Sequence, residues 1–595
     1  EITCRDWSSD VCSSDLYFRG DGMALRYTNE STAWLTYPNG WHGQFNATMM
    51  EKYTRKNVYW LTVEATNGLR MDIQNGAPDN APLATSYRET KRIEQQSIWY
   101  SFHATGEDTW FWSRHQNTSP QTYAVSLTSP ISNSTATVRG EVLGRVHNSN
   151  YNPDHHTRAE FNGILIEDSF WDGPTRHFFE GTVSGNALIN GQNALTYRLY
   201  FDAYPGQSSD WVYFDWFEVE YERAYLAQND ISEFSGAAGT WRYQVPGFSS
   251  DVVWLMDITN PQTPVLINQA NFTSSTLTFQ IQSSTEQRYF AAGQNSLKQP
   301  LSLTFYSPAD LLSTTQGADY ILITAPEFLS GAQQLANLRS SQGLRVAVVN
   351  INDIYNQFNE GIYHPIAIKN FLRYAYYQWQ KPSPVFVVLI GDGNSNFLNV
   401  PIYGQAPIYM PPNLAWIDYT QGEIDNSNAL VTVVGDDLLP DMIVARIPVN
   451  SLTQMQAVVD KTIAYEQSLP DQVWQNTILM TADNVPDAAG DFVGISNQLI
   501  QDYVLPNYTS QTVYLNNYPD AATARSALVQ KINDGALIIS YVGHGYLDKW
   551  ASEGLFLTST IPSLSNSNRM PIVLSMTCMD GYWGRTGLAP AWGYA

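Results

Sequence analysis

The sequence has very little cysteine, no long apolar run and too few basic residues to balance its acidic ones. It contains 3 cysteines in 595 residues, so a fold held together by a disulfide framework is excluded. The longest apolar runs, such as residues 385–390, are far shorter than the roughly 20 residues of a membrane-spanning helix. The 32 Lys and Arg against 56 Asp and Glu give a formal charge of −24, which argues against a nucleic-acid-binding protein. We therefore expect a soluble or surface-attached chain with no transmembrane segment and no nucleic-acid partner.

Apolar and aromatic residues, by contrast, are abundant. Hydrophobic residues make up 43% of the chain and aromatic residues 13%, which is enough for several packed cores and excludes wholesale disorder. At roughly 150 residues per domain, the length predicts about four domains.

The first sixteen residues differ from the rest of the chain. Residues 4–16 show no apolar periodicity and none of the basic, apolar and small-residue regions of a signal peptide. We interpret residues 1–16 as a non-native, adapter-like segment, so a signal peptide is not present in this chain and the natural N-terminus is expected to lie outside it. Cys4 and Cys12 fall in this segment, which leaves Cys578 as the one cysteine of the remaining chain.

Residues 17–310 have the pattern of antiparallel β-sheets. Ser, Thr, Asn, Gly, Trp and Tyr dominate, and short runs such as residues 58–63 and 211–221 alternate between apolar and polar positions. Asn-Gly and Asp-Gly pairs mark turns between these runs. The pattern predicts a β-sandwich domain at 17–140, a second sandwich of jelly-roll or carbohydrate-binding type at 141–225, and a small β domain at 226–310.

The hydrophobic period changes near residue 316, where strands begin to alternate with helices. Buried strands are predicted at 320–324, 346–349, 385–390, 442–445, 477–480, 512–515, 536–541 and 572–576. Helices are predicted from Pro326 to 343, and at 365–380, 451–467, 491–503 and 520–533. This alternation predicts an α/β domain at 317–595 whose mostly parallel sheet is covered by helices on both faces.

Two of these strands end at residues that could carry chemistry. The strand at 536–541 runs into Gly543-His544-Gly545, and the strand at 572–576 runs into Cys578. Ligands of open α/β sheets bind at the carboxyl ends of the strands, and neighbouring strands lie about 4.8 Å apart. If the two strands are neighbours, His544 and Cys578 lie side by side. A thiol beside an imidazole is the minimal machinery of a cysteine peptidase.

The glycines on either side of His544 extend this hypothesis. Gly543 and Gly545 would let the backbone come close to a substrate, and the amides of Gly545 and Cys578 could donate to a developing oxyanion. The alternatives are structural: a lone cysteine at a strand end is often a small buried apolar residue, and Gly-His-Gly is often a turn.

Several motifs, in order along the chain, resemble the gingipain family of cysteine peptidases, whose sheet is caspase-like. They are Val388-Leu389-Ile390-Gly391-Asp392, residues 441–449 (DMIVARIPV), residues 460–466 (DKTIAYE), the apolar strand into Gly543-His544-Gly545, Asn566-Ser567-Asn568 before Met570-Pro571, and Cys578-x-x-Gly581. The resemblance covers residues 317–590. In the family, elements continue past the nucleophile, whereas 595 − 578 = 17 residues follow Cys578 here, so we expect a C-terminally truncated domain.

The resemblance implies roles for individual residues. Cys578 would be the nucleophile that forms an acyl-enzyme, and His544 would be the general base. Asp483 matches the family's acidic residue that orients the histidine, although a helix or turn cap is the alternative. Asp491 falls near the acid that lines the pocket for the first substrate side chain in basic-specific members, and a helix N-terminus is its alternative. With Gly543, Asp491 completes the predicted substrate-binding set.

The chemistry itself requires no cofactor, but a structural Ca²⁺ is a further hypothesis. Asp392, Asn394 and Asn396 offer oxygen ligands at alternating positions, as calcium loops do, and members of the family bind calcium. The distal Glu of such a loop is not identifiable, and an Asx-rich turn is the alternative.

The sequence therefore predicts a secreted or cell-surface bacterial cysteine endopeptidase that acts on polypeptides. A large β region before the peptidase domain also resembles the type IX secretion signal peptidase (sortase) of the same family, which would make secretion machinery a partner. The sequence leaves hydrolysis and transpeptidation both open. The rival hypothesis is an inactive surface adhesion or glycan-binding protein with a retired peptidase domain, in which aromatic runs such as residues 110–112 and Trp216-Phe217 stack on sugars instead of packing a core.

Overall fold

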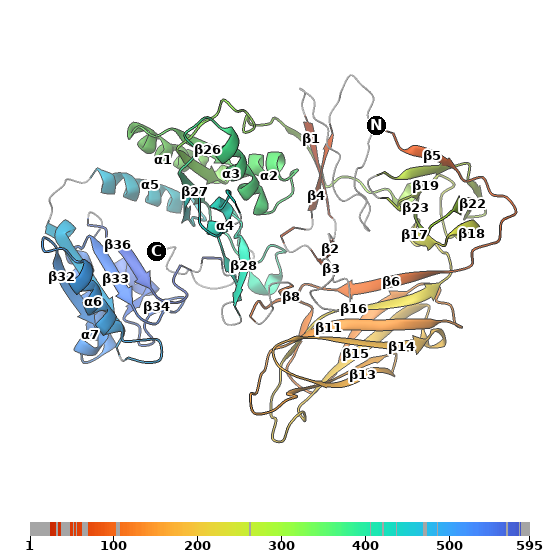
Figure 1. Cartoon of the computed structure of the whole chain (residues 1–595), viewed down its shortest axis with the longest axis horizontal. Coiled ribbons are helices and arrows are strands. Elements are labelled where there is room, and N and C mark those ends of the chain that lie inside the picture. Colours follow the sequence, from red (N-terminus) through yellow and green to blue (C-terminus); the bar gives the residue numbers. More distant parts are fainter. Residues whose placement is uncertain are drawn as a thin grey trace. The chain divides into compact units, whose positions relative to one another are not determined.

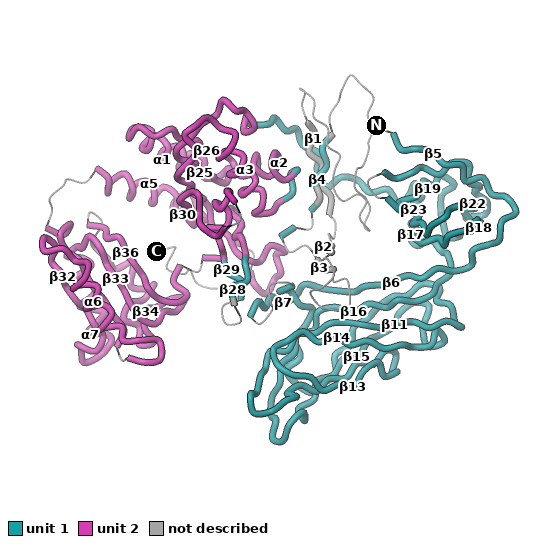
Figure 2. The backbone as a smooth tube through the Cα atoms, in the orientation of Figure 1, with its two compact units in different colours: residues 1–308, 360–362, 415–424 teal, residues 309–359, 363–414, 425–595 magenta. Residues whose placement is uncertain are grey.

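The structure is a computed structural model. It describes residues 24–30, 34–36, 48–50, 53–54, 56–61, 70–102, 108–260, 263–404, 406–418, 422–435, 437–467, 473–484, 486–566, 569–581 and 583–584. The adapter-like residues 1–16 lie outside the described residues. The chain divides into two compact units (Figure 2). Unit 1 comprises Glu1–Pro308, Glu360–Ile362 and Ala415–Ile424, and unit 2 comprises Ala309–Asn359, Tyr363–Leu414 and Asp425–Ala595.

Residues 87–223 of unit 1 form one antiparallel β-sandwich (Figure 1). One sheet has the strand order β10-β15-β12-β13, and the other has the order β14-β11-β16-β6. The strands are β6 (Tyr87–Glu94), β10 (Gln121–Leu127), β11 (Thr135–Gly144), β12 (His155–Phe161), β13 (Ile164–Trp171), β14 (Arg176–Ser184), β15 (Gly191–Tyr200) and β16 (Val212–Arg223). Between the sheets lies a core that includes Tyr123, Phe161 and Phe214, because the alternation along each strand turns every second side chain inward.

The sandwich crosses a predicted domain boundary. The boundary between residues 140 and 141 falls inside β11, whose residues on both sides pair with β14 and β16. The domains predicted at 17–140 and 141–225 therefore share this single sandwich, which corrects the predicted division. Composition could not show this, because the pairing of β11 is decided by strands far away in the sequence.

A second β body in unit 1 has two sheets, β17-β23-β19-β20-β5 and β18-β22-β21, around a core that includes Phe234, Tyr243 and Phe279. Strand β5 (Asp72–Asn75) pairs in parallel with β20, so residues from the predicted first domain join the predicted third one. The other strands of this body are β17 (Ile231–Gly236), β18 (Gly239–Pro246), β19 (Val253–Asp257), β20 (Val265–Asn268), β21 (Asn271–Thr273), β22 (Thr276–Ser283) and β23 (Gln287–Gly293).

Smaller sheets complete unit 1. Strand β1 (Ala24–Glu30) lies between β24 (Ser302–Tyr306) and β4 (Lys56–Leu61). The short strands are β2 (Trp34–Thr36), β3 (Thr48–Met50), β7 (Ile98–Trp99), β8 (Trp110–Phe111) and β9 (Ser113–His115), with β28 (Leu414–Asp418) and β29 (Gly422–Asp425) late in the chain.

The first sheet of unit 2 is parallel and has the order β26-β25-β27-β30. Ile321 and Ile323 of β25 pack in one core with α2 and α3, whereas Leu322 packs on the opposite face with α1 and α5. The elements are β25 (Tyr320–Thr324), α1 (Leu329–Ser341), β26 (Val346–Asn350), α2 (Ile351–Phe358), α3 (Ile366–Gln378), β27 (Phe386–Ile390), α4 (Asn428–Val431), β30 (Ile443–Ile447) and α5 (Leu452–Glu466).

The second sheet of unit 2 is also parallel, with the order β32-β31-β33-β36. Leu479 and Ile539 pack against α7, and Met480 and Val542 pack against α6 on the other face. The elements are β31 (Thr477–Ala482), α6 (Phe492–Tyr503), β32 (Thr509–Tyr514), α7 (Ala521–Asp534), β33 (Ile538–Val542), β34 (Lys549–Trp550), β35 (Phe556–Leu557) and β36 (Ile572–Met576).

The predicted fold class is confirmed: antiparallel β-sandwich structure precedes an α/β region whose parallel strands carry helices on both faces. The parallel strands form two sheets of four rather than one sheet. Within the described part of the chain, no helix is long and apolar enough to span a membrane.

Candidate active site

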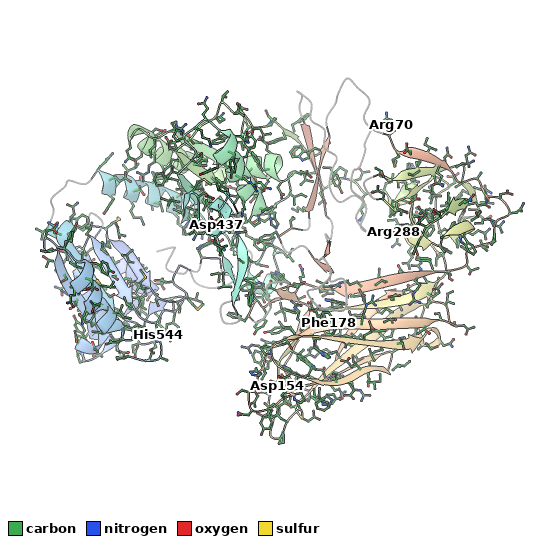
Figure 3. All side chains as sticks on the ribbon, viewed as in Figure 1. Arg70, Asp154, Phe178, Arg288, Asp437 and His544 are labelled. Atoms are coloured by element: carbon green, nitrogen blue, oxygen red, sulfur yellow. The ribbon has the colours of Figure 1, made fainter. Side chains whose placement is uncertain are left out.

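His544 and Cys578 follow neighbouring strands of the second sheet. Strands β33 and β36 pair in parallel, and Val542 lies opposite Met576. His544 is the second residue after Val542, and Cys578 is the second residue after Met576. The two residues therefore hold equivalent positions beyond the carboxyl ends of adjacent strands, which lie about 4.8 Å apart. Figure 3 labels His544 in this part of unit 2.

The backbones that carry these residues touch. The amide of Gly543 donates to the Met576 carbonyl at 3.4 Å. A Cβ added to Gly545 would overlap the carbonyl oxygen of Cys578 and Oγ1 of Thr577, so this position requires glycine. The Cys578 side chain is exposed. The thiol of Cys578 is therefore accessible, and the loop that carries His544 lies directly against the main chain around Cys578.

The His544 ring is held by a carboxylate that the sequence analysis did not select. Its Nε2 contacts Oδ2 of Asp487 at 2.7 Å, and the two side chains are 44% and 46% exposed. The hydrogen bond that Asp487 accepts from the ring raises the pKa of His544, and the imidazole in turn lowers the pKa of Asp487. The ring of Phe492 meets the imidazole edge-on, with 5.2 Å between the ring centroids.

Asp487 has a fixed place in the loop that follows β31. Its Oδ1 accepts from the Ala489 amide at 2.8 Å, and its backbone forms a bridge with Gly490. Three aspartates follow β31 at intervals of four residues, at 483, 487 and 491. The sequence shows that carboxylates are available here, but the path of the loop decides which one reaches the histidine.

Asp483 contacts the main chain of His544. Its carboxylate is buried, and Oδ2 accepts from the His544 amide at 3.2 Å while Oδ1 accepts from Asn484 at 2.7 Å. Asp483 was predicted to orient the imidazole, but in the structure Asp487 contacts the ring and Asp483 contacts the His544 amide. The reason is local: Asp483 directly follows β31, and its own amide still pairs with the Val542 carbonyl. Asp483 thus fixes the backbone from which the ring extends.

Asp491 caps helix α6. Its Oδ1 accepts from the Gly494 amide at 2.9 Å, the usual hydrogen bond of an N-cap residue. This is the structural alternative that the sequence left open, and a role in substrate binding stays a prediction.

The turn after Cys578 is tied to neighbouring elements. Asp580 accepts from the Trp550 indole at 3.1 Å and from the Ser575 hydroxyl. Trp550 in turn stacks on Tyr541 of β33, with 4.5 Å between centroids. Met579 has a φ of 59°, a left-handed conformation that a non-glycine residue adopts only where its surroundings hold it. Through its contacts with Trp550 and Ser575, Asp580 holds the turn after Cys578 in place, which the sequence analysis did not predict.

The segment that carries Cys578 also contacts the rim of the first sheet. The guanidinium of Arg446, at the end of β30, lies over the Trp583 ring at 3.7 Å. The Ser395 amide donates to the Gly584 carbonyl at 2.9 Å. The Arg446 side chain is only 7% exposed, and desolvation lowers its pKa to about 10 despite the opposing effect of Asp425. The two contacts thus involve Arg446 and the loop that follows Gly391, both in or next to segments that resemble the gingipain family.

The predicted calcium loop is closed by its own hydrogen bonds. Asn394 Oδ1 accepts from the Asn396 amide at 2.9 Å, and Asn396 Oδ1 accepts from Val400 at 2.8 Å. Asp392 Oδ1 accepts from Gly393 at 2.8 Å. This is the hydrogen bonding of an Asx-rich turn. A calcium ion at this loop stays a prediction.

Comparisons with known proteins match the part of the chain that contains His544 and Cys578 to cysteine peptidases. Residues 313–593 match the model of peptidase family C25. Gingipain R1 of Porphyromonas gingivalis is 22% identical over 279 residues, which cover 46% of this chain and 25% of the relative. Gingipain R2 of Porphyromonas gingivalis is 22% identical over 281 residues, which cover 47% of this chain and 34% of the relative. The chain thus spans a quarter to a third of the length of these relatives.

Two solved structures extend the comparison. The crystal structure of dimeric latent PorU from Porphyromonas gingivalis has a TM-score of 0.57 at 17% identity, and the match covers 75% of this chain and 47% of that one. The crystal structure of the Arg-specific cysteine proteinase gingipain R has a TM-score of 0.35 at 18% identity, covering 49% and 60%. The fold similarity to PorU covers 75% of this chain, whereas the sequence matches to the gingipains cover 46% and 47%. The similarity to PorU therefore includes part of the β region.

Proposed function

Residues 313–593 belong to peptidase family C25, the gingipain family of cysteine peptidases, and on this premise we propose that the chain is an active cysteine endopeptidase. The observation that carries the proposal is the equivalent placement of His544 and Cys578 beyond paired strands, together with the hydrogen bond between His544 and Asp487. Its substrates are polypeptides, and its place of action is outside the cell or on the cell surface.

The residues divide the reaction between them. Because Nε2 of His544 is engaged by Asp487, Nδ1 is the ring nitrogen that takes the proton of the Cys578 thiol. The thiolate attacks the peptide carbonyl carbon, and a C–S bond forms. The amides of Gly545 and Cys578 donate to the resulting oxyanion.

Breakdown of this intermediate uses the same proton. His544 gives it to the leaving nitrogen, the C–N bond breaks, and the amine product departs from an acyl-enzyme. Water or an amine then attacks the acyl carbon, returns a proton through His544 and restores the Cys578 thiol.

A second candidate within the same chemistry is a secretion-linked signal peptidase or sortase. The similarity to PorU covers 75% of this chain, whereas the match to Gingipain R1 covers 46%, so the β region takes part in the former. In a transpeptidase, an amine instead of water resolves the acyl-enzyme. Adding a glycine amide to the peptide reaction would then yield a new amide product, which mass spectrometry detects and a plain hydrolase would form only in trace.

The test of the main proposal is thiol labelling combined with hydrolysis. Full-length protein is treated with iodoacetamide or a peptidyl chloromethyl ketone, and labelling is mapped by peptide mass because Cys4 and Cys12 also carry thiols. We expect the ketone to label Cys578 selectively and Cys578→Ala to lose hydrolysis of a fluorogenic peptide library. Even labelling of all three cysteines, or unchanged hydrolysis in Cys578→Ala, would overturn the proposal.

The rival, a retired peptidase that binds glycans, predicts different results. Of the aromatic residues proposed as sugar platforms, Trp110, Phe111, Trp216 and Phe217 are buried, and Trp112 is partly buried against the core of the sandwich. A glycan array on the full chain, run beside the peptide library, separates the two: sugar binding without selective Cys578 labelling would favour the rival.

A further inference from the structure

The β-sandwich of unit 1 contains three carboxylates that meet away from the peptidase site. Glu94 is the last residue of β6, Asp108 lies two residues before β8, and Asp215 lies in β16. One oxygen from each lies within 4.8 Å of the others. We call Glu94, Asp108 and Asp215 the buried acidic cluster.

A β-bulge brings Asp215 into this cluster. Glu141 of β11 pairs with Trp216, whereas the next residue, Val142, pairs with Phe214. Asp215 is therefore the extra residue of the bulge, with no partner on β11. Bulges redirect a side chain at the cost of regular pairing. Here the redirected side chain is a carboxylate placed beside two others.

Two carboxylate oxygens of the buried acidic cluster have no hydrogen-bond partner among the described residues. The side chains of Glu94 and Asp215 are each 1% exposed. Within the part of the chain that the structure describes, neither Glu94 Oε1 nor Asp215 Oδ1 has a hydrogen-bond partner. A buried carboxylate oxygen without a partner costs a desolvation penalty of about 1–3 kcal/mol or more. Two such oxygens in one place indicate that a ligand completes the site.

The charges around the cluster are also unbalanced. Glu141 adds a fourth carboxylate, and the cations in contact are Arg92 and Arg176. Arg92 donates to Glu94 Oε2 at 3.0 Å, and Arg176 donates to Asp215 Oδ2 at 3.1 Å and to Glu141. Counting the described residues named here in their ionised forms, four carboxylates and two guanidinium groups leave two negative charges in a buried space, which one divalent cation neutralises. Carboxylates this close together repel one another in a buried space when they are ionised, and a bound cation removes that repulsion.

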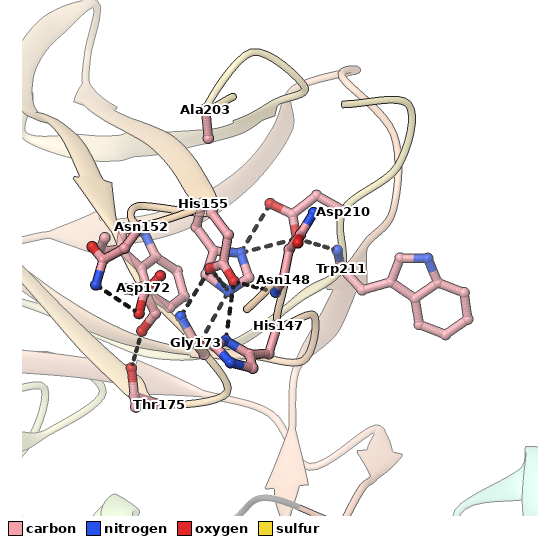
Figure 4. A network of polar contacts seen from close by, with 12 residues as sticks. His147, Asn148, Asn152, His155, Asp172, Gly173, Thr175, Ala203, Asp210 and Trp211 are labelled. Atoms are coloured by element: carbon pink, nitrogen blue, oxygen red, sulfur yellow. Dashed lines mark hydrogen bonds and ion pairs between the residues drawn. The ribbon is translucent and has the colours of Figure 1, made fainter. Parts of the chain in front are cut away.

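A second polar cluster in the sandwich differs from the buried acidic cluster in its hydrogen bonding. His147, Asp154 and Asp172 also bring three possible ligands together (Figure 4). Both oxygens of Asp154, however, accept from backbone amides at 2.8 Å, those of Gly173 and Asn148. Among the described residues, Asp172 Oδ1 lacks a hydrogen-bond partner, but the His147 side chain is 51% exposed, so water can reach this network and its demand for an ion is smaller.

We propose that Glu94, Asp108 and Asp215 bind a Ca²⁺ ion inside the β-sandwich. All three ligands are oxygens, which hard cations prefer, and among the described residues no imidazole or thiolate joins the cluster to favour zinc. Ca²⁺–oxygen bonds of about 2.4 Å allow opposite ligands to lie about 4.8 Å apart, which accommodates the spacing in the cluster. The ion joins the end of β6, the entry to β8 and the bulge of β16, so it stabilises the sandwich and takes no part in peptide hydrolysis.

The test is calcium binding by the full chain after treatment with EDTA and buffer exchange. Bound calcium is counted by elemental mass spectrometry, and thermal unfolding is followed with and without added CaCl₂. We expect the double variant Glu94→Gln, Asp215→Asn to bind one equivalent less than the parent and to lose the calcium-dependent rise in melting temperature. Glu180→Gln, which neutralises a more exposed carboxylate of β14, should bind as the parent does.

A milder variant covers the case in which the double variant does not fold. Asp108→Asn keeps the side-chain oxygen that accepts from the Trp110 amide and removes only the charge. We expect it to fold and to bind calcium at the cluster at least tenfold more weakly. Equal calcium stoichiometry and affinity in the parent and both variants would overturn the proposal. A parent that binds no calcium, with a double variant more stable than the parent, would show that protons balance the cluster instead.

Discussion

The pair of His544 and Asp487 controls the protonation of the candidate base. A hydrogen bond between imidazolium and carboxylate favours the charged form of each, so the pKa of His544 is raised and that of Asp487 is lowered. The stability from the raised histidine is present at low pH and is lost as pH rises through its pKa in the folded state. The stability from the lowered aspartate is present above its ordinary pKa and is lost as pH falls through its folded value. The pair is therefore strongest between the ordinary pKa values of Asp and His, roughly pH 4 to 6.5.

Asp487→Asn should lower the pKa of His544. Diethyl pyrocarbonate modifies neutral imidazole, so the rate of carbethoxylation of His544, followed by peptide mass against pH, reports this pKa. We expect the midpoint to move to lower pH in the variant, because the carboxylate no longer stabilises the imidazolium. Asp491→Asn, four residues further on, retains a helix cap and serves as the control. Equal midpoints in the parent and Asp487→Asn would contradict the assignment of Asp487.

The cap at Asp491 allows a second test. Asp491→Ala should reduce the stability of α6 by about 1 kcal/mol, whereas Asp491→Ser retains a capping oxygen and should cost little. Hydrogen exchange of the α6 amides measures the difference. Equal protection in both variants would remove the capping role. A selective loss of hydrolysis of Arg and Lys substrates in Asp491→Ser would instead place the carboxylate in the substrate pocket.

At the scale of elements, the parallel pairing of β33 and β36 turns two distant motifs into one site. Residues 544 and 578 are 34 positions apart in the sequence, since 578 − 544 = 34, yet the register makes them equivalent. Their approach depends on Gly545, where any side chain would collide with the Cys578 carbonyl. Strand β36 itself is exposed at Ile572, Val573, Leu574 and Met576, so its position rests on its pairing with β33.

Gly545→Ala should therefore separate the two loops. A Cβ at this position forces the main chain around Cys578 to shift, and we expect hydrolysis to fall by at least tenfold while the circular dichroism spectrum stays that of the parent. Gly584→Ala is the matched control, because among the described residues its Cβ would meet only a Pro412 carbon at 3.9 Å. Full activity in Gly545→Ala would show that the loops do not need this close approach.

At the scale of the whole molecule, the cysteine segment links the two sheets of unit 2. Trp583 lies on Arg446, and the Gly584 carbonyl accepts from Ser395, so residues that follow the second sheet are fixed by loops of the first. The motifs around Gly391 and Arg446 thus support the site without joining it.

Trp583→Leu should weaken this link. A cation–π contact of this kind contributes about 1 kcal/mol, so we expect peptide hydrolysis by the full chain to fall by about fivefold. The same substitution at Trp254, which is 38% exposed in unit 1, should leave hydrolysis unchanged. An equal effect of both substitutions would show that the loss is not specific to the contact with Arg446.

Much of the architecture was predictable because the signals are local. The period of apolar residues located β25, β27, β31 and β33, and Asp491 and Gly343 lie at helix ends as such residues commonly do. The short helix α2 was missed, because it follows β26 directly and contains no starting signal apart from Asn350. Asp487 was missed because three equally spaced aspartates follow β31, and sequence spacing cannot reveal which way a loop turns.

The amino-acid sequence by itself determined the kinds of elements, the change from β-sandwich to α/β structure and the single thiol of the peptidase region, because these depend on side-chain period and composition. Only the tertiary structure decided which strands are neighbours, that β11 crosses a predicted boundary, that Asp487 holds the histidine and that Asp215 turns toward two other carboxylates. Those outcomes depend on contacts between residues far apart in the chain, whose free energies no local pattern contains.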